Sequence, residues 1–163
     1  MNLDNKVISK LTFEKSINTV PSYSPDGEKI VFASDRSGSR RLYVMNKDGT
    51  NVKKISFGNG IYDKPSWSPD GRLIAFVKMQ NGQFHLSIMS PKGENERSLT
   101  SAYLLEGIKW SPNGRYLLYS KQRGPFGKDS IPYIYIMDIL TTNEYRLPTP
   151  ENEGATDPDW INK

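Results

Sequence analysis

Three carboxylates are the residues of this sequence best suited to chemistry. Asp63, Glu106 and Asp157 each lie a few residues before a recurring segment with an aromatic side chain. Two carboxylates that flank a substrate can serve as acid and base or as acid and nucleophile, as in glycoside hydrolysis. The three positions recur with an internal repeat, however, and repetition favours one shared structural role over an acid–base pair. We therefore expect a ring of acidic side chains that accepts hydrogen bonds from Lys, Arg or backbone N–H groups of a partner.

Other catalytic chemistries lack their residues here. The 163 residues include no cysteine and one histidine, His85, which removes thiolate metal sites and most Ser/His/Asp or Cys/His arrangements. No Gly-x-Ser-x-Gly elbow occurs, and Gly127-Lys128 lacks the Ser/Thr and the upstream glycine of a phosphate-binding loop. We expect no catalytic residue, no metal and no cofactor, and predict that the protein is not an enzyme.

Charge and hydropathy exclude two further classes. Lys and Arg number 22 against 18 Asp and Glu, and the basic residues are scattered along the chain. A nucleic-acid-binding protein usually gathers them on one face, so we expect no nucleic-acid partner. No apolar run approaches the roughly 18 residues of a membrane-spanning helix, so we expect no membrane insertion. The first four residues are polar and lack the apolar stretch of a signal peptide.

An internal repeat predicts the fold. The pattern Pro-Ser-aromatic-Ser-Pro-Asp-Gly at residues 21–27 returns at 65–71 and, in a variant form, at 108–114. Its aromatic residues, Tyr23, Trp67 and Trp110, are 44 and 43 residues apart, and Trp160 follows 50 residues later. Each repeat holds four short segments rich in β-branched and aromatic residues between turns of Gly, Pro, Asn and Asp. Four-stranded units at this period are typical of β-propeller blades, so we predict an all-β fold of antiparallel blades.

The repeat also predicts the boundaries of the blades. We expect a partial propeller over residues 1–163, with complete blades at 20–56, 64–100 and 107–148. Residues 6–12 match the outer strand of a preceding blade, and residues 157–161 match a closing inner strand. Closed propellers have about four to eight blades, so three blades and two single strands are expected to be part of a larger, six-bladed ring. Exposed edges at both ends also allow two half-propellers to self-associate.

The Ser-Pro-Asp-Gly turns and the aromatic residues have structural explanations. Proline presets φ, Asp or Asn bonds a nearby backbone N–H, and glycine takes a positive φ. A calcium site at Asp26 and Asp70 is disfavoured because the third copy has Asn113. We expect the repeated aromatic residues to pack between blades, with a sugar-stacking platform as the alternative. His85 is expected to be a packed or edge residue.

These motifs resemble the repeat of the TolB propeller family. The resemblance rests on the recurring pattern, on Ser34-Asp35-Arg36-Ser37-Gly38, and on the strand Leu42-Tyr43-Val44-Met45, and it covers almost the whole chain. Residues 101–106 and 144–148 are similar to C-terminal stretches of that family. The resemblance implies a six-bladed propeller behind a smaller N-terminal α/β domain, neither of which is complete in this chain.

The resemblance further implies a non-catalytic, protein-binding function in the Tol–Pal cell-envelope system. The propeller mouth would bind the Pal-type peptidoglycan-associated lipoprotein in the periplasm, supporting outer-membrane integrity and constriction during cell division. A contact with TolA would be made through regions missing here. The alternative is the propeller module of a prolyl-oligopeptidase-like serine peptidase or of a carbohydrate-active protein.

The expected partner-binding residues lie just before each inner strand. They are Asn18, Thr19, Tyr62, Asp63, Leu105, Glu106, Thr156 and Asp157. By the resemblance, Asn18 and Thr19 match residues of the Pal-binding mouth, whereas Val20 departs from the acidic residue common there. The other possibility is that these side chains cap their own turns or bind water in the channel.

Overall fold

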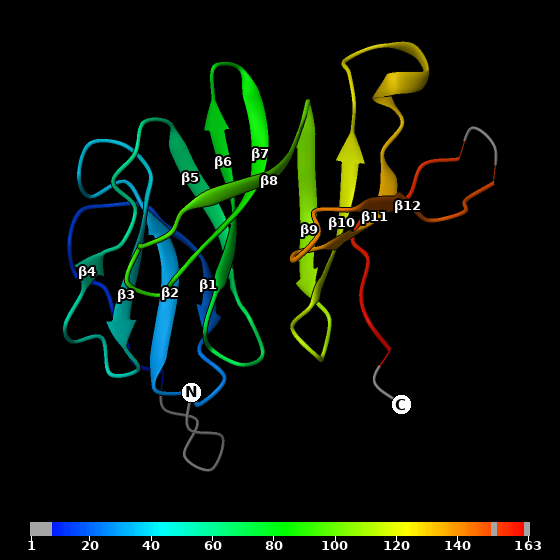
Figure 1. Ribbon diagram of the computed structural model, residues 1–163. Coiled ribbons are helices and arrows are strands. Elements are labelled where there is room, and N and C mark those ends of the chain that lie inside the picture. The colour runs from blue at the N-terminus through cyan, green and yellow to red at the C-terminus, as the bar shows by residue number, and fades with distance from the viewer. Residues whose placement is uncertain (1–7, 151–152, 162–163) are drawn as a thin grey trace.

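The computed structural model describes residues 8–150 and 153–161, which form an all-β structure (Figure 1). Three four-stranded antiparallel sheets follow one another along the chain, and within each sheet the strands are neighbours in chain order. The predicted fold of four-stranded antiparallel blades is confirmed. Figure 1 shows the third sheet beside the other two, with the described C-terminal segment next to it.

The strands have the following bounds. The first blade contains β1 Asn18–Tyr23, β2 Lys29–Ser34, β3 Arg41–Asn46 and β4 Lys53–Lys54. The second contains β5 Ile61–Trp67, β6 Ile74–Gln80, β7 Gln83–Met89 and β8 Arg97–Ala102. The third contains β9 Leu104–Trp110, β10 Tyr116–Gln122, β11 Tyr133–Asp138 and β12 Glu144–Arg146. The longer loop of the third blade includes a short 3-10 helix, η1, over Gly127–Ser130.

The first strand of each blade is the innermost. β1 contacts β5, and β5 contacts β9, so these strands form an inner row. Trp67 and Trp110 are only 8% and 9% exposed, and both belong to apolar clusters that join neighbouring blades. The Trp110 indole N–H also donates to Ser66 O of the preceding blade at 3.0 Å. These two tryptophans therefore pack between blades and offer no open stacking platform.

The Ser-Pro-Asp/Asn-Gly turns carry one hydrogen-bond network three times over. In the second blade Ser68 Oγ donates to Asp70 Oδ1 at 2.7 Å, and the backbone N–H of Arg72 donates to the same oxygen at 3.0 Å. Asn113 accepts the equivalent bonds in the third blade at 2.7 and 3.0 Å. Gly71, at φ +72°, needs the left-handed conformation that glycine adopts without strain. The turn network therefore accepts either a carboxylate or an amide.

Asp70→Asn should leave the turn intact and remove part of the acid sensitivity. Partial burial by itself raises the pKa of Asp70, but hydrogen bonds from Ser68 and Arg72 outweigh it and lower that pKa to about 2. A depressed carboxyl pKa stabilises the fold above the ordinary value of 3.8, and this contribution disappears as the pH falls towards 2. Because the side chain is 39% exposed and screened by solvent, we expect a loss of at most about 1 kcal/mol at pH 7.

The measurement is urea unfolding of both proteins from pH 7 to pH 2. The difference between Asp70→Asn and the parent should vanish towards pH 2. Asn113→Asp is the matched reciprocal variant, and it should introduce the same pH dependence in the third blade. A pH-independent difference for Asp70→Asn would contradict the expected ionic contribution.

The additional strand expected at each end is not formed. Residues 8–12 and 157–161 have no strand, and residues 6 and 7 lie outside the described part of the chain. A strand needs a hydrogen-bonded neighbour, and the strands with which these segments would pair in a complete blade do not occur among the described residues.

Both end segments nevertheless make contacts typical of a neighbouring blade. The indole N–H of Trp160 points to Lys109 O at 3.4 Å, as that of Trp110 points to Ser66 O. At the other end, Leu11 lies against Gly49 so closely that a Cβ added to the glycine would be 2.7 Å from Leu11 O. The equivalent contact between the first two blades brings Ile55 against Gly93, where an added Cβ would be 2.0 Å from Ile55 O. The end segments thus occupy the positions of an inner and an outer strand without forming a ladder.

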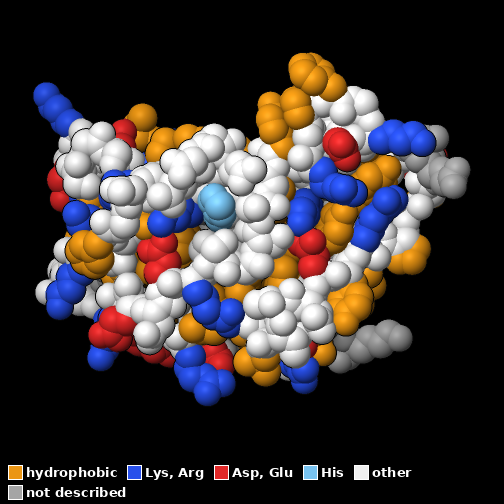
Figure 2. Space-filling view, turned by 45° about the horizontal axis from the view of Figure 1, so that its top comes forward, with side chains coloured by type: hydrophobic (Ala, Val, Ile, Leu, Met, Phe, Trp, Pro, Cys, Tyr) orange, Lys and Arg blue, Asp and Glu red, His pale blue; other side chains and the backbone are white. Residues whose placement is uncertain are grey.

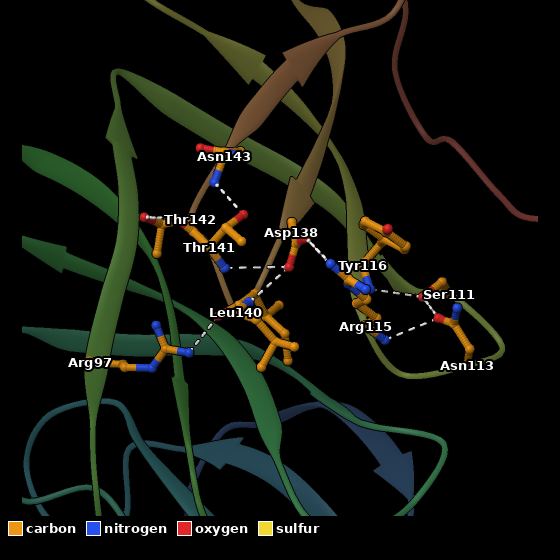
Figure 3. A network of polar contacts seen from close by, with 11 residues as sticks. Arg97, Ser111, Asn113, Arg115, Tyr116, Asp138, Leu140, Thr141, Thr142 and Asn143 are labelled. Atoms are coloured by element: carbon orange, nitrogen blue, oxygen red, sulfur yellow. Dashed lines mark hydrogen bonds and ion pairs between the residues drawn. The ribbon is translucent and has the colours of Figure 1, made fainter.

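A polar network joins the outer parts of the second and third blades (Figure 3). Arg97 Nη2 donates to Ile139 O at 2.6 Å across the blade boundary. Within the third blade, Arg115 Nη2 lies 2.9 Å from the buried Asp138 carboxylate, which also accepts the backbone N–H of Leu140 at 2.9 Å. Hydrogen bonds from Arg115 and Leu140 hold the pKa of Asp138 below its ordinary value. The network fixes the turn after β11 against the second blade.

Candidate partner-binding mouth

The predicted mouth residues of the three blades lie within bulged strands rather than in loops. The β1–β2 register shifts between Thr19 and Ser22, and the β5–β6 register shifts between Asp63 and Ser66. At each bulge one residue takes a left-handed conformation: Val20 at φ 49°, Lys64 at φ 52° and Gly107 at φ 62°. Bulges re-aim side chains near the ends of strands. The residue before each left-handed position is one of the predicted mouth residues, Thr19, Asp63 or Glu106.

Val20 is the strained member of this set. A β-branched residue is rarely found at positive φ, and glycine fills the same position in the third blade. Left-handed backbone at a non-glycine residue is often retained at binding sites. Val20 is also 45% exposed, so its apolar side chain adds to the surface beside Thr19.

The expected position of Asp157 is wrong by one residue. Asp157 has φ 51° and precedes Pro158, as Val20 precedes Pro21 and Lys64 precedes Pro65. It therefore corresponds to the bulged residue, and Thr156 corresponds to Thr19, Asp63 and Glu106. Both Thr156 and Asp157 are exposed in the C-terminal segment. Two carboxylates rather than three occupy equivalent positions of the mouth.

The two mouth carboxylates are paired across blade boundaries. Arg40 of the first blade lies 2.5 Å from Asp63 of the second, and Lys64 of the second lies 2.8 Å from Glu106 of the third. The expected ring of free acidic side chains is thus a row of alternating charges. Figure 2 likewise shows acidic and basic side chains interspersed over the face that it presents. Arg40 and Lys64 belong to the mouth and were not singled out from the sequence.

The ion pairs of the mouth remain accessible to a partner. Lys64 and Glu106 are 35% and 44% exposed, whereas Asp63 is 21% exposed. Ion pairs of this exposure contribute about 0–1 kcal/mol, so a partner can replace them with its own contacts at little cost. The arrangement suits recognition of a polar protein surface that carries both signs of charge.

Tyr62 and Leu105 are not surface residues, contrary to expectation. Both side chains are fully buried. The Tyr62 ring stacks on Phe76 with centroids 5.5 Å apart, and its hydroxyl donates to Glu96 at 2.9 Å. Burial raises the pKa of Tyr62. These two residues support the mouth from within the core.

Asn18 and Thr19 lie at the mouth of the first blade. Asn18 Oδ1 accepts a hydrogen bond from Arg36 at 3.0 Å. Thr19 Oγ1 is buried and has no hydrogen-bond partner among the described residues. Both residues line a pocket of about 250 Å³ that also includes Phe32 and Leu11. A buried hydroxyl without a partner is unusual, and it marks Thr19 as a residue that contributes no hydrogen bond to the described fold.

The described residues show neither a metal cluster nor a membrane helix. Within residues 8–150 and 153–161, no group of three or more His, Cys, Asp or Glu side chains is placed to hold a metal ion. In the same part of the chain, no helix is both long enough and apolar enough to cross a membrane.

The three four-stranded sheets and the inner row of β1, β5 and β9 show that the chain is a β-propeller built from repeated blades. A polar mouth lies at the start of its inner strands. The model of the TolB beta propeller domain matches residues 1–163. The chain belongs to that family.

Relatives agree with this assignment. The Tol-Pal system protein TolB of Rickettsia bellii is 46% identical over 68 residues, which are 41% of this chain and 15% of that protein. The crystal structure of TolB from Acinetobacter baumannii superimposes with a TM-score of 0.77 at 22% identity, covering 93% of this chain and 37% of that one. A putative TolB from Agrobacterium tumefaciens gives a TM-score of 0.70 at 25% identity, covering 83% and 50% of the two chains. The chain thus spans half or less of the length of these relatives.

Proposed function

We propose that the chain is a non-catalytic, protein-binding propeller module of a Tol–Pal system that acts in the periplasm. Its mouth binds a Pal-type lipoprotein, and this contact supports outer-membrane integrity and constriction during cell division. The observation that carries the proposal is the row of inter-blade ion pairs, Arg40–Asp63 and Lys64–Glu106, at the start of the inner strands. The membership of the TolB propeller family supports the choice of partner.

The partner of this mouth is a protein surface rather than a small substrate. Asp63 and Glu106 each face a cation of the chain itself, which does not favour an acid–base pair poised around a scissile bond. Charged groups at the rim of an interface set partner choice and association rate more than affinity. The exposed Val20 supplies an apolar contact beside them.

Calorimetric titration of the chain with the soluble domain of a Pal-type lipoprotein tests the proposal. We expect saturable binding, and Asp63→Ala and Glu106→Ala should each weaken it about five- to tenfold, about 1–1.4 kcal/mol. Glu94→Gln, in the turn that follows β7, is the matched control and should bind like the parent. Binding that is unchanged in both mouth variants, or that does not occur, would refute the mouth as the Pal site.

Self-association of half-propellers is a separate proposal. The first blade and the segment before it expose large apolar side chains, among them Phe13 at 77%, Ile17 at 60% and Tyr23 at 58%. Apolar surface and open strand edges favour pairing with a second copy. Light scattering should then give about twice the mass of 18.5 kDa, and a monomer at all concentrations would exclude it.

A further inference from the structure

A lysine-lined pocket lies at the outer edge of the first two blades, away from the mouth. It has a volume of about 530 Å³ and is bounded by β4 and the turn that follows β7. Lys29, Lys53, Lys54 and Lys92 line it, over a floor that includes Val44 and Ile55. The floor residues are 9% and 3% exposed, so the pocket combines an apolar base with a basic rim.

The lysines of this pocket make few contacts within the fold, and Lys54 Nζ lies 5.3 Å from the centroid of the Phe57 ring. Within the described residues, Lys53, Lys54 and Lys92 pair with no carboxylate, and no Asp or Glu lines the pocket. Lys29 bonds only the Asn46 amide oxygen, at 3.4 Å. The lining thus carries four lysines and no carboxylate, so an anionic group placed in the pocket would gain favourable charge interactions.

At the boundary between the second and third blades, the position that corresponds to this pocket is bridged by a hydrogen bond. Strand pairing makes Lys53 equivalent to Arg97, since Lys53 pairs with Val44 and Arg97 with Ile88 at matching positions. Arg97 crosses the boundary and donates to Ile139 O at 2.6 Å (Figure 3). Lys53 makes no such bond to the turn after β7. The pocket between the first two blades therefore stays open where its counterpart is bridged.

A strand edge borders the pocket. β4 is the outermost strand of the first sheet, as Figure 1 shows, and its two residues pair only with β3. Its other edge offers backbone N–H and C=O groups to an extended peptide. Addition of a strand to a sheet edge is a common mode of peptide recognition, in which alternate side chains give specificity.

The surroundings select against broad polyanions. Asp48 and Glu94 lie in the turns on either side of the pocket, and Asp26 lines an adjacent pocket that shares Lys29. These carboxylates would repel a flat anionic surface such as a membrane or a nucleic-acid duplex. No arginine lines the pocket, although arginine is the residue best suited to bidentate phosphate binding. A narrow ligand with separate carboxylates fits this pattern better.

We infer that this pocket binds an acidic, extended segment of a partner protein, in which carboxylates alternate with apolar side chains. The segment pairs with the free edge of β4. Successive side chains of a paired strand face opposite sides of the sheet, so its carboxylates meet Lys53 and Lys92 on the face of Val44 and Ile55. Its apolar side chains lie on the opposite face, beside Lys54 and the exposed Phe57. The site is independent of the mouth, so it stands whether or not the chain binds a Pal-type lipoprotein.

Fluorescence anisotropy with a labelled Glu-Val-Glu-Val-Glu-Val peptide and the full chain tests the inference. We expect saturable binding that weakens from about 20 to about 300 mM salt, because screening shortens the range of the charges. The variant K53Q/K54Q/K92Q should bind about tenfold more weakly, because three cations beside the bound segment are lost. These three side chains make no ion pair among the described residues, and the contact of Lys54 is with the exposed ring of Phe57. The thermal unfolding of the triple variant should therefore match that of the parent.

Matched controls separate a built site from general basicity. K10Q/K15Q/K128Q removes the same number of charges elsewhere and should bind within about twofold of the parent. The inference is overturned if both triple variants weaken binding equally, if the peptide with Gln for Glu binds as well, or if the peptide does not bind at all. It is also overturned if millimolar phosphate or phosphatidylglycerol vesicles bind in a way that depends on Lys53, Lys54 and Lys92 while the peptide does not.

Discussion

Replacing Gly93 with alanine is expected to destabilise the chain by about 3 kcal/mol. Gly93 has φ +84°, and a left-handed conformation costs an alanine about 1–2 kcal/mol. A Cβ at this position would also lie 2.0 Å from Ile55 O, far inside contact distance. Overpacking of this kind costs a further 1–3 kcal/mol or so. The turn after β7 therefore tolerates no side chain at this residue.

Neither side of this contact can move freely. Ile55 is 3% exposed, and its backbone N–H donates to Leu42 O at 2.9 Å. On the other side, the N–H of Gly93 donates to Ser90 O at 2.9 Å, which closes the turn. Relief of the clash must therefore break a hydrogen bond or separate the first two blades.

Gly38→Ala is the matched control. Gly38 has φ +90°, but a Cβ there would meet no atom within 4 Å. The Gly38→Ala variant should lose only the cost of holding alanine in a left-handed conformation, about 1–2 kcal/mol of the free energy of unfolding. Urea unfolding of both variants measures the difference between strain alone and strain with a clash. Equal losses for the two variants would mean that the turn after β7 is not held rigidly against the first blade.

Local chemistry made the strands and turns predictable from the sequence. Each Ser-Pro-Asp/Asn-Gly segment contains its own hydrogen-bond donors and acceptors, so Asn113 and Asp70 build the same turn without tertiary help. The end segments were less predictable, because a strand depends on a neighbour that lies outside it. Residues 157–161 carry the right pattern and place Trp160 correctly, yet they form no ladder.

The mouth depended on tertiary contacts that a repeat pattern does not contain. Ser87 faces Phe76 in the second blade, where the third blade places Tyr135 opposite Tyr119. A side chain as small as serine leaves room over Phe76, and Tyr62 fills it from β5. In the second blade Tyr62 therefore takes the place that the Tyr135 ring has in the third blade. This explains why Tyr62 is a core residue and not a surface residue. The dipeptide Asp157-Pro158, by contrast, was a visible signal that Asp157 occupies the bulge.

Glu144→Val is the second variant with a large expected effect, a loss of about 2–3 kcal/mol. The Glu144 carboxylate accepts a hydrogen bond from the fully buried Tyr119 and pairs with Lys121 Nζ at 2.8 Å. Lys121 and Glu144 are 11% and 23% exposed. Removal of the carboxylate leaves the Tyr119 hydroxyl without its acceptor. Lys121 keeps the Thr100 hydroxyl at 3.0 Å and the face of the Tyr135 ring at 5.3 Å, but it loses its counter-charge. A charge left unpaired in such surroundings is costly.

The first blade has no ion pair at the three positions that correspond to Tyr119, Lys121 and Glu144. Strand pairing makes Phe32 equivalent to Tyr119, Ser34 to Lys121 and Val52 to Glu144. Phe32 there stacks on Tyr43 with centroids 5.9 Å apart, much as Tyr119 stacks on Tyr135. Arg36 lies over both rings, 5.1 Å from the Phe32 centroid and 4.9 Å from the Tyr43 centroid, and its Nε donates to Ser34 Oγ at 3.1 Å. Blade geometry is therefore compatible with apolar residues at the positions of Tyr119 and Glu144.

The triple variant Y119F/K121M/E144V should recover most of the stability lost by Glu144→Val alone. Replacing every member of a buried polar cluster with apolar groups of similar size is often nearly neutral, whereas removing one member is not. Urea unfolding at pH 7 should place the triple variant within about 1 kcal/mol of the parent. If the triple variant is as unstable as Glu144→Val, the loss comes from packing of the Glu144 stem rather than from the unpaired charge and hydroxyl. Recovery would show that apolar side chains can replace the polar cluster of Tyr119, Lys121 and Glu144 in this blade.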